Sequence, residues 1–256
     1  MKLDKQAVID LVLETRNIIL DEQAAENVTV KGAADYVTQV DFSVQAFMQK
    51  GLYELEPSIG FIAEEKENRD LKADGCYWIL DPIDGTTNLI NHYGLSAVSL
   101  GLYEKGEITF GVVYNPFHGE LFTAEKGKGA FLNGNPIHVA KREMKDSVIS
   151  YGSAPYGKSG SGKLFQLFHQ IFERCADFRR FGSAALDLCY VACGRSDAYL
   201  EENLKPWDYA AGVLILSEAG GVVSDWKGEK LPYLQNSAVL GAAPGVAAEL
   251  KDMIIK

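Results

Sequence analysis

Apolar and polar residues follow one another along this chain in patterns that predict both helices and strands. Apolar residues recur at helical spacing over residues 4–23, which predicts an amphipathic helix, and a second helix is predicted at about residues 42–54. Short apolar runs bounded by polar residues at 59–63 and 76–80 have the length of strands. Helices and strands are therefore mixed from the start of the chain.

The middle of the chain predicts an antiparallel meander. Residues 96–102, 108–113 and 120–125 have the pattern of strands, and the segments between them are rich in turn-forming residues. The Lys-Gly-Lys-Gly stretch at 126–129 resembles a phosphate-binding loop only superficially, because no Lys-Ser or Lys-Thr pair follows it. We interpret it as structural, leading into a further hairpin at 130–134.

A polar stretch at residues 141–146 is the most plausible boundary between two lobes, residues 1–143 and residues 144–256. The second lobe is predicted to contain strands at 148–152 and 196–201, helices at 164–175 and 213–219, and a flexible Gly-Ser loop at 157–163. Alternating strands and helices in both lobes predict an α/β (α+β) fold.

Composition narrows the classes of protein that fit. With 256 residues, of which 47% are hydrophobic and 23% charged, the chain predicts a globular protein with a substantial core. No apolar run approaches the ~20 residues of a membrane span, and the N-terminus lacks the pattern of a signal peptide. We therefore expect a cytoplasmic protein with no membrane partner.

The formal net charge of −10 argues against a nucleic acid as partner. The 4 cysteines show no Cys-x-x-Cys spacing, so we expect buried, reduced thiols. None of the 4 histidines lies in a metal-binding spacing or is singled out as a catalyst.

The most informative stretch is Trp-Ile-Leu-Asp-Pro-Ile-Asp-Gly-Thr-Thr-Asn at residues 78–88. Its apolar strand gives way at Asp81 to two acids, and Pro82 restricts the backbone so that Asp81 and Asp84 can converge on one side of a turn. Two facing carboxylates suit a hard cation such as Mg²⁺, with the carbonyl of Ile83 as a further ligand. The alternative is an Asp-rich turn with a Thr cap.

The residues that follow predict a phosphate site in the same loop. Gly85, Thr86, Thr87 and Asn88 offer exposed amides and hydroxyls where a short helix can begin. Free N–H groups at a helix start can receive a phosphate. Metal and phosphate would then share one loop, and bound cations would make the site locally positive despite the acidic chain.

The stretch Asp-Pro-Ile-Asp-Gly-Thr-Thr-Asn at 81–88 resembles, without a departure, the metal-binding signature of the inositol monophosphatase family. Trp-Asp-Tyr-Ala-Ala-Gly at 207–212 resembles the family's second signature, and the resemblance covers nearly the whole chain in order. It implies a Mg²⁺-dependent, Li⁺-sensitive phosphomonoesterase. It also implies a layered α-β-α-β-α sandwich of the sugar phosphatase type, with the site between two lobes, and a homodimer.

The resemblance also implies roles for individual residues. Two or three Mg²⁺ ions would be held by Glu64, Asp81, the Ile83 carbonyl, Asp84 and Asp208. Asp41 would accept a proton from Thr86, and Thr86 and Glu64 would activate the attacking water. From the residues alone, Asp41 and Asp208 could equally be helix N-caps, and Glu64 could belong to a surface charge pair.

Substrate residues complete the prediction. The phosphate would lie on the amides of Gly85 and Thr86, and the resemblance places Asp84, Ser183, Ala184, Glu201 and Asp208 around the substrate. Glu201 matches the family's sugar-hydroxyl acceptor, which favours myo-inositol 1-phosphate. Arg179 and Arg180 lie just upstream of Ser183 and could serve a second phosphate.

Other functions stay open from sequence. Fructose 1,6-bisphosphate is the main rival substrate, alone or beside inositol phosphate, and nucleotide 3′-phosphates are a further rival. The hypothesis from another class is a regulatory protein that binds metal and phosphate without turnover. Because every position expected to carry chemistry holds the required residue type, the enzyme is favoured.

Overall fold

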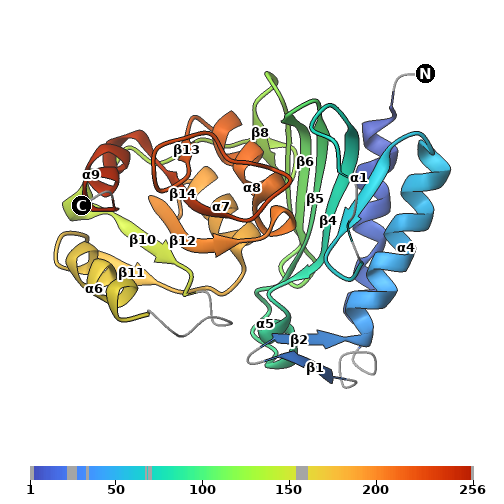
Figure 1. Ribbon diagram of the computed structural model, residues 1–256, viewed down its shortest axis with the longest axis horizontal. Coiled ribbons are helices and arrows are strands. Elements are labelled where there is room, and N and C mark those ends of the chain that lie inside the picture. Colours follow the sequence, from blue (N-terminus) through green and yellow to red (C-terminus); the bar gives the residue numbers. More distant parts are fainter. Residues whose placement is uncertain are drawn as a thin grey trace.

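The computed structural model describes residues 3–21, 28–32, 35–66, 68, 71–153 and 161–254, and only the backbone of residues 28–32 and 35–37. Residues 157–160 of the predicted Gly-Ser loop lie outside this range. The elements fall into five layers, two sheets alternating with three groups of helices (Figure 1). This confirms the predicted α-β-α-β-α sandwich.

The larger sheet runs in chain order from β3 to β9, with β3 parallel to β4 and every later neighbour antiparallel. Its strands are β3 (Gly60–Ala63), β4 (Cys76–Asp84), β5 (Ala97–Glu104), β6 (Glu107–Asn115), β7 (Glu120–Glu125), β8 (Ala130–Leu132) and β9 (Asn135–Pro136). Positive φ angles at Lys105 and Gly106, and again at Asn133 and Gly134, make two-residue hairpin turns that match the twist of the strands. The predicted meander is confirmed.

The smaller sheet has the order β11-β10-β12-β14-β13. Strand β10 is parallel to β11 and β12, whereas β14 is antiparallel to β12 and β13. Its strands are β10 (Val148–Tyr151), β11 (Asp177–Arg179), β12 (Ala198–Leu204), β13 (Val222–Ser224) and β14 (Ser237–Ala242). The two sheets thus fall on either side of the polar stretch at 141–146, where the 3₁₀ turn η1 (Met144–Asp146) lies. The division into two lobes stays a prediction.

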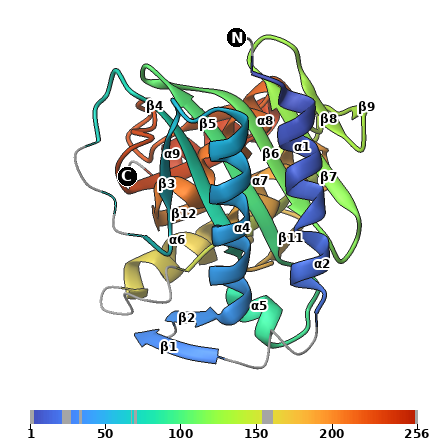
Figure 2. The same ribbon diagram turned by 90° about the vertical axis from the view of Figure 1, so that its right-hand side faces the viewer.

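Helices cover both outer faces and fill the space between the sheets. Figure 2 shows α1 (Lys5–Glu14), α2 (Arg16–Ile19) and α4 (Gln39–Leu55) across the outer face of the larger sheet. In Figure 1, α6 (Ser161–Phe172) and α9 (Pro244–Ile254) lie on the outside of the smaller sheet, and α7 (Ala184–Ala192) and α8 (Pro206–Glu218) lie between the sheets. None of the helices in the described ranges has the length and apolar composition needed to span a bilayer.

The middle layer explains why α8 is apolar almost all round. It packs between two sheets, so Ala210, Ala211 and most of its other residues are buried. Glycines in the larger sheet let it approach closely: a Cβ at Gly101 would lie 3.3 Å from Cβ of Ala210, and one at Gly111 would lie 3.1 Å from the carbonyl oxygen of Ala211. One hydrophobic core therefore joins the larger sheet to α7 and α8.

Several predicted boundaries differ from the structure. The first helical stretch is broken at Thr15, whose hydroxyl donates to the carbonyl of Val12 at 2.6 Å, and α2 ends at Ile19; residues 22 and 23 of the predicted helix lie outside the described residues. Helix α4 starts earlier than predicted because Thr38 caps it. The strand predicted at 76–80 continues as β4 to Asp84 through a bulge.

The hairpin of β1 (Val28–Gly32) and β2 (Asp35–Thr38) was not predicted. It lies beside α5 (Thr86–Ile90), as Figure 2 shows. In the second half, α6 covers residues 161–172 instead of 164–175, and α8 begins at Pro206 instead of residue 213. Proline at a first helical position needs no N–H partner, which makes Pro206 a natural start.

Candidate active site

The segment from Asp81 to Asn88 leaves the larger sheet and turns into α5. The Asp81 carboxylate accepts the N–H of Ile83 at 2.9 Å, which ties the acid back to its own turn. Gly85 has a φ of 90° and precedes the first residue of α5. A Cβ at Gly85 would lie 3.0 Å from the carbonyl oxygen of Leu95, so both the backbone angle and the space favour glycine. The predicted helix start at this turn is confirmed.

Thr86 and Asp41 are brought together across 45 positions of sequence. The Thr86 hydroxyl lies 3.2 Å from Oδ1 of Asp41 and 3.1 Å from the carbonyl oxygen of Ile83. Oδ2 of Asp41 accepts the N–H and the hydroxyl of Thr38 at 2.8 and 2.6 Å. The N-cap of α4 is Thr38, so the alternative of Asp41 as N-cap is wrong: Asp41 is the third helical residue of a capping box.

Asp208 occupies the same position in another helix. It is the third residue of α8, and its Oδ2 accepts the N–H of Lys205, the residue before the helix, at 2.7 Å. The N-cap alternative is therefore wrong for Asp208 as well. In both helices a cap interaction uses one carboxylate oxygen and fixes the direction of the other.

Glu64 comes directly after β3, and Asp81 lies in the neighbouring strand β4. The two strands are parallel, with Ala63 opposite Leu80. Glu64 and Asp81 therefore meet at one sheet edge, as the strand pattern predicted. The main chain next to Glu64 is held by the Gln45 side chain, which bonds both the N–H and the carbonyl of Glu65 at 3.0 Å.

Hydrogen bonds of Asp84 and Asn88 connect this turn to the second half of the chain. Oδ2 of Asp84 accepts the Ser183 hydroxyl at 2.5 Å and the N–H of Ala185 at 2.7 Å, at the start of α7. The Asn88 amide donates to the carbonyls of Leu95 and Phe181 at 2.7 and 2.8 Å. The predicted helix entry at Gly182 and Ser183 is thus fixed against the turn that carries Asp84.

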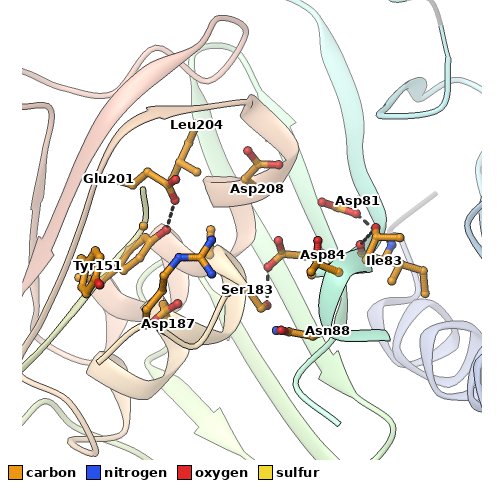
Figure 3. A pocket seen from close by; sticks show the side chains of 18 of the residues that line it. Asp81, Ile83, Asp84, Asn88, Tyr151, Ser183, Asp187, Glu201, Leu204 and Asp208 are labelled. Carbon is orange, nitrogen blue, oxygen red and sulfur yellow. Dashed lines mark hydrogen bonds between the residues drawn. The ribbon is translucent and has the colours of Figure 1, made fainter. Parts of the chain in front are cut away.

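These residues surround one cavity, shown in Figure 3. Every predicted metal and substrate residue lines it; these are Glu64, Asp81, Ile83, Asp84, Gly85, Thr86, Ser183, Ala184, Glu201 and Asp208. Asp41 does not line the cavity but contacts it through Thr86. The sequence therefore predicted a set of residues that the fold gathers in one place.

The cavity is strongly acidic. Burial raises the pKa of Asp81 well above its usual range, and the neighbouring carboxylates of Glu64, Asp84 and Asp208 raise it further. Burial raises the pKa of Asp84 to about 6, although bonds from Ser183 and Ala185 counteract this. The pKa of Asp208 is also raised, by burial and then by Asp84 and Glu64. Such a group of like charges is stabilised either by protons or by a cation.

The donor types fit Mg²⁺, which prefers carboxylate and carbonyl oxygens. Six carboxylates and the Ile83 carbonyl border one cavity, and within the described ranges the one cationic side chain among the lining residues is Arg180. Among the described residues, no three or more His, Cys, Asp or Glu side chains are already grouped so that they could hold a metal ion. The chemistry of the site therefore suits a hard cation, with the donors spread around the cavity wall.

Other lining residues were missed or left undecided by sequence. Tyr151, Gly152, Asp187, Tyr199 and Asn203 were not singled out, since they lie in strands, a helix or a connection without a motif of their own. Arg180 lines the cavity, with its Nε 3.2 Å from the Ser153 hydroxyl, whereas Arg179 pairs with Asp177 at 2.5 Å. The structure thus separates two arginines that sequence treated alike.

Comparison with known proteins agrees with this architecture. The sequence model of the inositol monophosphatase family matches residues 2–256. An inositol-1-monophosphatase of Rhizobium meliloti (strain 1021) is 41% identical over 230 residues, 89% of this chain and 85% of that protein. The Nus factor SuhB of Escherichia coli (strain K12) is 39% identical over 224 residues, 87% of this chain and 84% of that protein.

A solved structure is similarly close. The extragenic suppressor protein suhB from Bartonella henselae superposes with a TM-score of 0.90 at 35% identity, covering 98% of both chains. Similarity of this extent, over nearly the full length of both chains, is typical of members of one family.

Proposed function

The chain belongs to the inositol monophosphatase family and is a phosphatase, and we propose that it hydrolyses the phosphate monoester of a small polyol, myo-inositol 1-phosphate first among them. The observation that carries this proposal is the position of Glu201. It lines the same cavity as Glu64, Asp81, Asp84 and Asp208 but comes from the smaller sheet. One cavity thus combines an acidic cluster suited to cation and phosphate with a separate carboxylate suited to hydroxyl groups.

On the phosphate side we propose that two or three Mg²⁺ ions are held by Glu64, Asp81, the Ile83 carbonyl, Asp84 and Asp208. When bound, these ions neutralise the carboxylates and the charge on the phosphate. The amides of Gly85 and Thr86, at the start of α5, bind phosphate oxygens. The raised pKa values of Asp81, Asp84 and Asp208 support this assignment, because a neighbouring positive charge stabilises the ionised form of each group.

The attacking water is positioned by Thr86 and Glu64. Asp41 can take the hydroxyl hydrogen of Thr86, which lies 3.2 Å away, and this directs the lone pairs of Thr86 toward the cavity. The Thr86 oxygen then accepts a hydrogen bond from water, and Glu64 helps to remove its proton. The water attacks phosphorus in line with the leaving oxygen, and no phosphoenzyme forms.

Substrate choice depends on the opposite side of the cavity. The phosphate contacts are common to all phosphate monoesters, so discrimination has to come from the group that carries the phosphate. Glu201 accepts hydrogen bonds from ring hydroxyls, and a substrate without them forgoes these bonds to a nearly buried carboxylate. Arg180 offers a positive charge to a second phosphate, so fructose 1,6-bisphosphate is the expected additional substrate and adenosine 3′,5′-bisphosphate a poor one.

A substrate panel tests this assignment. We expect myo-inositol 1-phosphate to give the highest kcat/KM at saturating Mg²⁺, and Glu201→Gln to lower it. Glu202→Gln is the matched control, because Glu202 is the next residue of β12 but is exposed and does not line the cavity. The inositol assignment is wrong if adenosine bisphosphate leads the panel, or if Glu201→Gln leaves inositol phosphate turnover unchanged.

A non-catalytic regulatory protein is the alternative from another class, and the Nus factor among its relatives favours testing it. Turnover decides between the two, because a regulator would bind Mg²⁺ and phosphate without releasing product. We further propose that the protein is a cytoplasmic homodimer and that Li⁺ inhibits it. Each chain would have two lobes, residues 1–143 and 144–256. Light scattering that gives a monomer, or full activity in LiCl, would contradict these points.

A further inference from the structure

Two residues lie against the carboxylate of Glu201. The Tyr199 hydroxyl, two residues earlier on β12, donates a hydrogen bond to its Oε2. Gly152 lies close to the same carboxylate, and a Cβ there would be only 1.9 Å from Oε2 and 2.0 Å from Cδ of Glu201. Tyr199 and Gly152 also line the cavity. The carboxylate therefore occupies space that any other residue at position 152 would fill.

The backbone around Gly152 gives this contact little freedom to shift. Strand β10 is parallel to β12, with Tyr151 opposite Leu200, and the N–H of Gly152 donates to the carbonyl of Leu200 at 3.0 Å. Residue 152 is thus attached to the strand that carries Glu201. A methyl group there would move the Glu201 carboxylate rather than the backbone.

The Tyr199 hydroxyl supplies a hydrogen-bond donor to Glu201 among neighbouring carboxyls. The carboxyls of Asp84 and Asp187 lie near enough to Glu201 to affect each other's ionisation. Tyr199 is buried to 1% exposure, and burial together with the nearby carboxylates raises its pKa well above the usual range. Its phenol therefore stays neutral and acts as a donor to Glu201.

From this geometry we propose that Tyr199 and Gly152 are positioning residues that hold Glu201 where it meets substrate hydroxyls, and that they set the selectivity for polyol phosphates. This inference rests on the proposed function. Neither residue contacts the phosphate in this account, so both act through Glu201. Their loss should lower discrimination between substrates while leaving recognition of phosphate intact.

The test compares Tyr199→Phe and Gly152→Ala with the wild type on two substrates. Myo-inositol 1-phosphate carries neighbouring hydroxyls and p-nitrophenyl phosphate carries none, so the ratio of their kcat/KM values measures polyol selectivity. We expect Tyr199→Phe to lower this ratio about tenfold, the usual loss for one hydrogen bond to a charged group, mainly through KM for inositol phosphate. Gly152→Ala should lower it at least as far, and inhibition by inorganic phosphate should not change.

Tyr103→Phe is the matched control. Tyr103 is also a buried tyrosine whose hydroxyl makes one hydrogen bond, to the carbonyl of Ala73 at 2.7 Å, but it lies on β5 and does not line the cavity. Its removal should leave the selectivity ratio unchanged. This control separates loss of a buried hydroxyl as such from loss of the contact to Glu201.

A double mutant isolates the route through Glu201. If Tyr199 acts by positioning Glu201, then Tyr199→Phe added to Glu201→Gln produces no further loss of selectivity. Additive losses, or an equal fall for both substrates in Tyr199→Phe, would overturn the inference while leaving the proposed function in place. A wild type without preference for inositol phosphate would instead refute the proposed function, and this inference with it.

Discussion

The hydroxyl of Ser183 donates to Oδ2 of Asp84 at 2.5 Å, although the two residues are 99 positions apart in sequence. The same oxygen accepts the N–H of Ala185 at 2.7 Å, so Asp84 closes the N-terminus of α7 in the middle layer. Ser183 in turn accepts the N–H of Leu186 at 3.3 Å. The acid at the end of β4 is thereby oriented by a helix from the other half of the chain.

Replacing Ser183 by alanine should weaken both the fold and the site. It removes the cap of α7 and one donor to a buried carboxylate, for a loss of about 1–2 kcal/mol in the free energy of unfolding. Urea denaturation measures this loss, and kcat/KM should fall in parallel because Asp84 loses its orientation. Ser43→Ala, at a half-buried position of α4 that does not line the cavity, is the control. Wild-type stability and activity in Ser183→Ala would contradict the assignment.

The free energy of unfolding without divalent cations should fall as pH rises from about 4 to 6. Burial raises the pKa of Asp84 from 3.8 to about 6, so over this interval the unfolded chain has released a proton that the folded protein keeps. The contribution is at most about 3 kcal/mol. Asp81, Asp187 and Asp208 also have raised pKa values, which extends the fall to higher pH.

Denaturation at several pH values in EDTA, for wild type and Asp84→Asn, checks this prediction. In Asp84→Asn, the free energy of unfolding should fall less as pH rises, because the contribution of Asp84 is absent. Added Mg²⁺ should stabilise the wild type more at pH 7.5 than at pH 5, because protons compete with the cation for the carboxylate. Identical slopes for the two proteins would show that Asp84 is not the titrating group.

Thr86→Ala should lower kcat about 100-fold or more while changing Mg²⁺ affinity much less. The Thr86 hydroxyl lies 3.2 Å from Oδ1 of Asp41, and its proposed role is to accept a hydrogen bond from the attacking water and so help to activate it. Thr86→Ser keeps the hydroxyl and should retain most of the activity. Rates at saturating substrate and a Mg²⁺ titration separate the two effects; equal losses in both would assign Thr86 to cation binding.

Asp197 should matter for stability rather than for chemistry. Its buried carboxylate accepts Nε of Arg142 at 2.8 and 3.0 Å and the N–H of Val148 at 2.8 Å, which ties the polar stretch at 141–146 to the smaller sheet. Asp197→Ala should cost about 3 kcal/mol, the low end for a broken buried pair, because Arg142 is half-exposed.

Asp177→Ala offers the comparison for this measurement. Both side chains of its pair with Arg179 are exposed, so the loss should be much smaller than for Asp197→Ala. Urea denaturation of both variants provides the values. Similar losses in the two would show that the Arg142 pair contributes no more than a surface contact.

Local sequence predicted the parts of the site that lie in one stretch of chain. Residues 81–88 combine a strand end, a left-handed glycine and a helix start, and each of these has its own residue signal. The hairpin turns at Lys105-Gly106 and Asn133-Gly134 were likewise visible from composition. The layered order and the roles of Glu64, Asp41 and Glu201 needed the family resemblance as well.

What sequence could not show depends on contacts between distant segments. Tyr199 sits in a strand that has no special pattern, and the close approach of Gly152 to the Glu201 carboxylate is visible only when β10 and β12 are placed side by side. Asp41 resembles a helix cap, but Thr38 takes that position because its side chain bonds the N–H of Val40. The hairpin β1–β2 was missed because its alternation of apolar and polar residues, Val-Thr-Val-Lys at 28–31, is only four residues long.

The central claim is that this acidic cavity hydrolyses a polyol phosphate with the help of Mg²⁺. The most direct measurement is the release of inorganic phosphate from myo-inositol 1-phosphate by the wild type and by Asp84→Asn, each with Mg²⁺ and with EDTA, after circular dichroism has shown that the variant is folded. We predict release by the wild type that EDTA abolishes and Mg²⁺ restores, and a loss of at least about 1,000-fold in Asp84→Asn. Release that does not depend on Mg²⁺, or full activity in the folded Asp84→Asn variant, would contradict the account.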